Sequence, residues 1–407
     1  MAVAGLPGCG GNSAPIDSTP PPKLPDAGAN GELQRQPSRD VPLWSGRLKG
    51  PGVGGNPERA PLPEGGIFQW HYPKDQQGLT DEAFVPAPVA AMGDRVLAPL
   101  AGELGRRGVS CLPADVAQLD RPSPHWVYKT KNAVWRSAAV HEDVVLLVDG
   151  RVGDEERFLH CVDMATGKRR WRAAVTPKAS GRFVVAPDRA FIQDDESQLT
   201  CYDVDGEQQW SQRCSPLSID PVVVAGALIL AEEPSVLVGI DPETGRSRWR
   251  LPLSAAVTVA PAAWKDTLYV GTETELVAFE LTAGETTPLW NRPIDGVASD
   301  IAVTEKRIAL VNGKSELVLL KRGDGTEVVR KLGALPAVAP VLDESAVLFA
   351  TADQICRLDL SVHDAEPSRW ADLSWLGEPV TAMVYYRECL YLGIRGWGLV
   401  RFGDVGR

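Results

Sequence analysis

A ten-residue pattern recurs along the chain at a nearly constant interval, and this repeat restricts the fold more than any other feature of the sequence. Residues 162–171 read V-D-M-A-T-G-K-R-R-W, and residues 240–249 read I-D-P-E-T-G-R-S-R-W. The aspartate can accept hydrogen bonds from the backbone N–H groups of a turn, and the glycine can adopt the positive φ that such a turn requires. The pattern therefore predicts a β-hairpin in which one strand ends at the aspartate and the next runs through the tryptophan.

Weaker copies of the pattern occur elsewhere in the chain. Residues 202–210, 279–290 and 358–370 keep an acidic residue and the final tryptophan, whereas the copy at residues 320–329 ends in a valine. With Trp70 and Trp126, the copies define eight positions, and from Trp126 on these positions are about 40 residues apart. Units of this length with four short strands are typical of propeller blades. We therefore predict an all-β fold, an eight-bladed β-propeller over residues 66–402.

The combination of aspartate, Thr-Gly and tryptophan resembles the tryptophan-docking motif of pyrroloquinoline-quinone-like propellers. That family includes quinoprotein dehydrogenases and the propeller lipoprotein of the outer-membrane β-barrel assembly machinery, its B subunit. WD and kelch propellers fit less well, because no Gly-His…Trp-Asp pairing recurs. The resemblance covers roughly residues 66–402 and implies that indole side chains pack between neighbouring blades. The residues implied for this structural docking are Trp70, Trp126, Trp171, Trp210, Trp249, Trp290 and Trp370.

The two ends of the repeat region are each incomplete. Residues 67–72 contain Phe68 and Trp70 but have no blade of their own around them, whereas residues 382–402 supply three strands and no fourth. We predict that residues 67–72 add the outer strand to the C-terminal blade, because such closure removes the open edge between the first and last blades.

The N-terminal part differs in composition from the repeats. Leu6-Pro7-Gly8-Cys9 resembles a bacterial lipobox, although no basic region precedes it and the apolar stretch is short. We predict that residues 1–9 are the truncated end of a lipoprotein signal with a lipid on Cys9; the alternative is an ordinary N-terminus with a chance cysteine. Residues 10–65 are rich in proline and glycine and lack apolar periodicity, which predicts a disordered linker. These features predict a periplasmic or outer-membrane-anchored lipoprotein.

Charge and cysteine content exclude several classes of function. The formal net charge is −11 and no basic stripe is present, so we expect no nucleic-acid partner. No run of about 18 apolar residues occurs, so any membrane contact would be made through the lipid anchor. Four cysteines share a register on the predicted third strands and should pack as small apolar residues: Cys111, Cys161, Cys201 and Cys356. The absence of any C-x-x-C pair argues against a zinc site.

An eleven-residue segment, apolar in both halves around a polar turn, occurs eight times, and its first residue should lie where each innermost strand begins. These eight residues should form a ring at one mouth of the central channel: Ala87, Arg136, Arg182, Asp220, Ala260, Asp300, Ala339 and Ala382. In one interpretation Arg136 and Arg182 hold a small anionic or carbonyl ligand that Asp220 orients. In the other, the charged residues form salt bridges that line a water-filled channel.

The family resemblance leaves two functional hypotheses. A quinoprotein dehydrogenase would need carboxylate and amide ligands for Ca²⁺, an aspartate base and commonly a vicinal cysteine pair. The sequence has no adjacent cysteines and no C-x-x-C-H, and no catalytic set stands out. We therefore expect a non-catalytic, monomeric, cofactor-free propeller that binds or scaffolds proteins at the cell envelope. The alternative is a dehydrogenase that depends on pyrroloquinoline quinone and calcium, or a degenerate relative of one.

Overall fold

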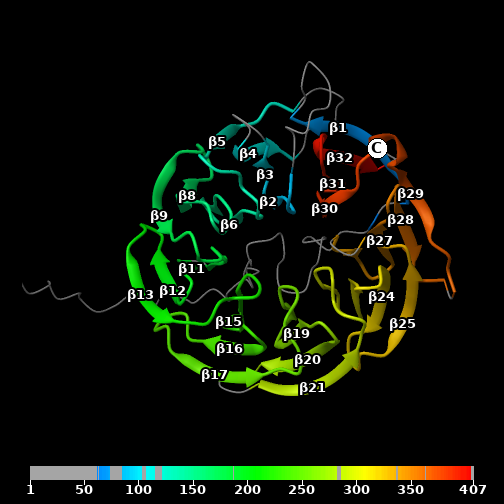
Figure 1. Ribbon diagram of the computed structural model, residues 1–407. Helices are drawn as coiled ribbons and strands as arrows, with labels where there is room; N and C mark the ends of the chain where they lie inside the picture. Colours follow the sequence, from blue (N-terminus) through cyan, green and yellow to red (C-terminus); the bar gives the residue numbers. More distant parts are fainter. Residues whose placement is uncertain are drawn as a thin grey trace, which may run out of the picture. The chain divides into compact units, whose positions relative to one another are not determined.

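The computed structural model describes residues 62, 64–73, 85–102, 107–114, 122–186, 188–281, 286–335, 338–362 and 364–404 of the 407-residue chain. In this part of the chain, eight four-stranded antiparallel sheets are arranged in a ring (Figure 1). The prediction of an all-β, eight-bladed propeller is therefore confirmed. The predicted signal at residues 1–9, with Cys9, and nearly all of the predicted linker lie outside the described residues.

The first four blades follow one another along the chain, each ordered from the innermost to the outermost strand. The first two consist of β2 (Ala90–Met92), β3 (Arg95–Ala101), β4 (Arg107–Pro113) and β5 (Trp126–Lys129), then β6 (Ala139–His141), β7 (Val144–Val148), β8 (Arg157–Asp163) and β9 (Arg169–Val175). The next two consist of β10 (Phe183–Ala186), β11 (Arg189–Asp195), β12 (Gln198–Asp203) and β13 (Gln208–Arg213), then β14 (Val222–Val224), β15 (Ala227–Glu232), β16 (Val236–Ile240) and β17 (Ser247–Pro252).

The fifth to seventh blades repeat this order, and a short 3₁₀ helix, η1 (Ser374–Leu376), follows the seventh. Their strands are β18 (Ala262–Trp264), β19 (Thr267–Gly271), β20 (Glu275–Leu281), β21 (Thr286–Pro293), β22 (Ala302–Val303), β23 (Arg307–Val311), β24 (Glu316–Lys321), β25 (Glu327–Leu332), β26 (Val341–Leu342), β27 (Ala346–Ala350), β28 (Gln354–Asp359) and β29 (Ser368–Asp372).

The eighth blade combines both ends of the described chain, as predicted. Its inner strands are β30 (Val380–Tyr386), β31 (Cys389–Ile394) and β32 (Gly398–Asp404), and its outer strand is β1 (Gly66–Tyr72). β1 pairs antiparallel with β32, so that Phe68 lies opposite Phe402 and Tyr72 opposite Leu399. Figure 1 shows the blue strand β1 beside the red strand β32.

The core of the ring lies between neighbouring blades. The inner and middle strands are apolar and almost completely buried, as in β7, where all five residues are buried. Residues of adjacent sheets share one cluster: Ile229 and Leu237 of the fourth blade pack with Leu268 and Phe279 of the fifth. The outermost strands are exposed on one face and alternate accordingly. One blade cannot bury both of its faces alone, so the ring is the stable unit.

Three tryptophans of the series dock on the turn of the following blade. Trp126 Nε1 donates a hydrogen bond of 2.9 Å to the carbonyl oxygen of Met164. Gly167 lies against the same indole with a φ of 69°, and a Cβ at this position would lie 2.6 Å from the ring. Both the close approach and the positive φ therefore require a glycine. The arrangement recurs for Trp171 with Val204 and Gly206 and for Trp210 with Pro242 and Gly245.

The remaining tryptophans of the series also lie between blades. Trp290 packs against Gly325, and Trp370 packs against Gly66 of β1. Trp70 and Trp370 are buried, and Trp126 is 9 % exposed. Four of the seven are only half-buried: Trp171, Trp210, Trp249 and Trp290.

The six described cysteines outside the N-terminal part are free thiols. Cys111, Cys161, Cys201 and Cys356 lie on β4, β8, β12 and β28, the third strands of their blades, and all four are buried. Burial raises the pKa of Cys111, Cys161 and Cys201 to about 12. The prediction that these side chains pack as small apolar residues is therefore confirmed.

The aspartate of the motif holds the docking turn in place. Asp163 accepts hydrogen bonds from Thr166 and forms an ion pair of 2.6 Å with Arg170. Asp241 accepts the N–H of Thr244 at 3.0 Å and forms an ion pair of 2.7 Å with Arg248. In each case the arginine is the largest cause that lowers the pKa of the carboxyl group to about 2.

These two carboxylates should make stability depend on pH in the acid range. Their folded-state pKa values lie below the ordinary value of about 3.9, so their contribution is complete above about pH 5 and is lost as the pH falls through 4 towards 2. We expect the variant Asp163→Asn/Asp241→Asn to be less stable at pH 7 and to lose less stability between pH 4 and pH 3. Urea unfolding at pH 7, 4 and 3 measures this. Asp205→Asn, an exposed turn aspartate, is the control; equal acid losses in wild type and the double variant would contradict the prediction.

Candidate functional site

A cavity of about 480 Å³ lies where the innermost strands of several blades begin. Six of the eight residues predicted for the channel mouth line it: Ala87, Arg136, Asp220, Asp300, Ala339 and Ala382. Arg182 reaches the same place through its contact with Asp220, whereas Ala260 is not part of the lining. Equivalent positions of the repeat thus converge on one site, although they are far apart in the sequence.

Two arginines share one carboxylate at this mouth. Arg136 Nη1 donates to Asp220 Oδ1 at 2.9 Å, and Arg182 Nη1 lies 3.8 Å from the same oxygen. Arg182 Nε also donates to the carbonyl oxygen of Leu217 at 2.9 Å. The side chain of Asp220 is only 11 % exposed, so the carboxylate is largely removed from water. These contacts favour the salt-bridge interpretation for Arg136, Arg182 and Asp220.

A third arginine lines the cavity and was not predicted. Arg157 is the first residue of β8 and is 2 % exposed. Its Nη atoms donate to three carbonyl oxygens, those of Thr176, Ala179 and Ser180, at 3.4, 2.6 and 3.4 Å. Its Nε has no hydrogen-bond partner among the described residues, and no ion pair is formed by its guanidinium there. Burial, followed by the nearby charge of Arg136, lowers the pKa of Arg157.

The loop between β7 and β8 brings a further cation to the cavity. Arg151 lies in this loop with its guanidinium 3.4 Å from the centroid of the Trp135 ring, and both residues line the cavity. Gly150 has a φ of 79°, and a Cβ there would lie 2.8 Å from Cγ of Arg157. One signal of this loop is present in the sequence: the interval from Trp126 to Trp171 is longer than those that follow it.

A second hollow, also of about 480 Å³, lies on the outer rim between the fourth and fifth blades. It is lined mainly by apolar side chains of β17, β20 and β21 and the residues beside them. We call this hollow the rim groove; its residues are Leu251, Pro252, Leu253, Ser254, Glu275, Val277, Phe279, Pro288, Leu289, Trp290 and Asn291. Leu289 is 49 % exposed.

No three histidine, cysteine, aspartate or glutamate side chains in the part of the chain that the structure describes are placed to hold a metal ion. No helix in that part of the chain has the length and apolar character needed to cross a membrane.

Comparison with known proteins gives one family and several related folds. The model of a family described as outer membrane protein assembly factor BamB matches residues 114–331, which is more than half of the chain. BamB from Moraxella catarrhalis is similar with a TM-score of 0.62 and 14 % identity, over 80 % of this chain and 97 % of that one. No curated protein matches the sequence.

Two other solved structures share the fold. The computationally designed Ika8 protein has a TM-score of 0.58 and 13 % identity, over 79 % of this chain and 96 % of its own. Sqt1 from Saccharomyces cerevisiae has a TM-score of 0.62 and 10 % identity, over 85 % of this chain and 100 % of its own. At these identities the likeness to solved structures shows the fold alone.

Proposed function

Because the chain belongs to the family of outer membrane protein assembly factor BamB, we propose that it is a protein-binding propeller that acts in the assembly of outer-membrane proteins. The family match over residues 114–331 is the observation that carries this proposal. In this function the chain is a monomer at the periplasmic side of the outer membrane, held there by a lipid on Cys9. It uses no cofactor and performs no reaction of its own.

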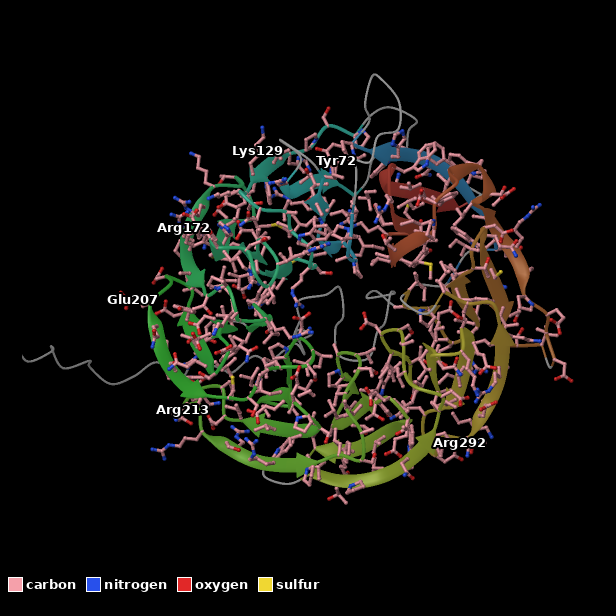
Figure 2. All side chains as sticks on the ribbon, in the orientation of Figure 1. Tyr72, Lys129, Arg172, Glu207, Arg213 and Arg292 are labelled. Carbon is pink, nitrogen blue, oxygen red and sulfur yellow. The ribbon has the colours of Figure 1, made fainter. Side chains whose placement is uncertain are left out.

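The rim groove supports the proposal, because an apolar hollow beside an outer strand suits an extended protein segment. The charged residues at the groove are of both signs, because Glu275 lines it and Arg292 lies on β21. Figure 2 shows Arg213 and Arg292 pointing outward from the ring, and neither forms an ion pair among the described residues. Arg292 lies on β21, which contributes residues to the groove, whereas Arg213 lies on β13 of the third blade. The partner segment therefore carries apolar side chains for the groove and an acidic side chain for Arg292.

The function is tested in cells of the source bacterium. Loss of the chain should lower the amount of β-barrel proteins in the outer membrane, and affinity purification of the full chain from solubilised envelopes should co-isolate components that assemble those proteins. Normal barrel levels together with no such component would contradict the proposal. So would dye reduction by the purified chain that requires both added pyrroloquinoline quinone and Ca²⁺, because a quinoprotein dehydrogenase would then be present.

A separate experiment tests whether the partner binds at the rim groove. Leu289→Asp puts a negative charge into the rim groove and should reduce co-isolation of the partner at least about tenfold, as the loss of an apolar anchor does. Val328→Asp is the matched control: Val328 is 45 % exposed on β25 and precedes the tryptophan-equivalent Val329, as Leu289 precedes Trp290. If Leu289→Asp has no effect while the partner still binds, the groove assignment is wrong and the function stands.

A further inference from the structure

The channel-mouth cavity holds a buried cation to which the described part of the chain supplies no carboxylate partner. Arg157 is 2 % exposed, and its hydrogen-bond partners among the described residues are backbone carbonyl oxygens only. Its Nε donor has none there. A buried charge is costly unless it is paired, and a buried donor without an acceptor adds to that cost. An anion in the cavity would compensate the charge, because a guanidinium attracts carboxylate oxygens.

Charge is distributed unevenly around this cavity. The second blade supplies Arg136, Arg151 and Arg157, whereas Asp220 and Asp300 belong to the fourth and sixth blades. Arg136 is bonded to Asp220 at 2.9 Å. The guanidinium of Arg151 forms no ion pair among the described residues and lies over the Trp135 ring instead, while its backbone N–H donates to Asp154 Oδ2 at 2.8 Å. Arg151 and Arg157, whose guanidinium groups form no ion pair among the described residues, therefore lie on one side of the cavity. Asp300 lines the other side.

The dimensions suit a small molecule. A volume of about 480 Å³ lies within the range of ordinary ligand pockets, which is about 300–1,000 Å³. Small apolar residues, Ala87, Ala339 and Ala382, form part of the wall and leave room beside the charged groups.

We propose that the channel-mouth cavity binds a small organic carboxylate, whose carboxylate group is held by Arg151 and Arg157 and whose hydroxyl or ammonium donors face the acidic side. This site is separate from the rim groove and independent of the proposed function. The carboxylate can belong to a free hydroxy acid or to the C-terminus of a short peptide. Both present the same group to the two arginines.

The test is calorimetric titration of the full chain at low ionic strength with three probes: L-malate, trialanine and trialanine amide. Malate, trialanine or both should bind with one site per chain, and the amide should not. Binding of malate alone identifies a free small acid, and binding of trialanine identifies a peptide C-terminus. The proposal is overturned if neither acid binds, or if the amide binds as tightly as trialanine.

Two arginine-to-glutamine variants distinguish binding at this site from a general effect of removing one positive charge. Arg151→Gln should weaken binding at least about tenfold, the loss expected for one charge-assisted hydrogen bond. Arg172→Gln is the matched control, because Arg172 also lies over an aromatic ring, at 4.1 Å from Phe158, on the same blade, but points outward (Figure 2). Unchanged binding by Arg151→Gln would overturn the proposal.

Arg157 itself can be required for folding, so it is probed by a conservative change. Arg157→Lys keeps the charge but has fewer donors in a different geometry. If it melts within a few degrees of wild type, it should bind the acid more weakly than Arg151→Gln does. If it does not fold, the Arg151 comparison alone decides the outcome.

Discussion

Removal of residues 1–75 should abolish cooperative folding of the ring, whereas removal of residues 1–60 should leave a folded protein. The difference between the two truncations is β1, the outer strand of the eighth blade. Without β1, the edge of β32 would be open and the tryptophan between the eighth and first blades would be missing. A shorter truncation at residue 60 keeps Leu62, which is buried and donates its N–H to Asp343 Oδ2 at 2.7 Å.

The expected size of this effect follows from one side chain. Trp70 is 3 % exposed and packs edge-on against Tyr391 at a centroid distance of 6.2 Å. Truncating a buried tryptophan to alanine costs about 3–5 kcal/mol. The whole strand contributes more than this, and the total stability of a protein is typically about 5–15 kcal/mol. Loss of β1 is therefore expected to remove most of the free energy of unfolding.

Thermal melting followed by circular dichroism compares the full chain and both truncated proteins, with Trp70→Ala in the full chain as an intermediate. The expected order of melting temperature is the full chain and the 1–60 deletion together, then Trp70→Ala, then the 1–75 deletion without a cooperative transition. Similar melting of the two truncated proteins would mean that β1 does not close the ring.

Most of the fold could be predicted because each blade repeats the same local chemistry. The Asp–Thr-Gly–Trp copies at residues 162–171 and 240–249 need only a turn and a strand, and both depend on nearby residues. The period then sets the number of blades. Exposure of the indoles was harder to predict. Trp171 is half-buried and Trp70 is buried, although they hold equivalent positions, because packing by the neighbouring blade differs.

The candidate site was predicted only where it follows the repeat. Arg136, Asp220 and Asp300 occupy the same position of the eleven-residue segment, so ring symmetry brings them to one mouth. Arg157 lies on β8, the third strand of its blade, and its side chain reaches the cavity by passing close to Gly150 and Gly181. That approach depends on positive φ angles in two loops, which no periodicity of the sequence encodes.

Substituting Asp220 should destabilise the ring more than substituting either of the two arginines that share its carboxylate. Asp220→Ala leaves Arg136 and Arg182 near each other without the carboxylate that they share at 2.9 and 3.8 Å. Breaking a buried ion pair costs about 3–5 kcal/mol and an exposed one at most about 1 kcal/mol. The side chains of Arg136 and Asp220 are 28 % and 11 % exposed, so an intermediate loss of about 2–3 kcal/mol is expected.

Arg182→Ala should cost less, because Arg136 keeps its shorter bond to Asp220. The double variant Arg136→Ala/Asp220→Ala should be more stable than Asp220→Ala alone, since removing both partners leaves one fewer uncompensated charge. Urea unfolding of wild type, Arg136→Ala, Asp220→Ala and the double variant gives the coupling energy between positions 136 and 220, and Arg182→Ala is measured beside them. A larger loss for Arg182→Ala than for Asp220→Ala would contradict this order. The bond from Arg182 to the Leu217 carbonyl oxygen, rather than the shared carboxylate, would then hold the mouth together.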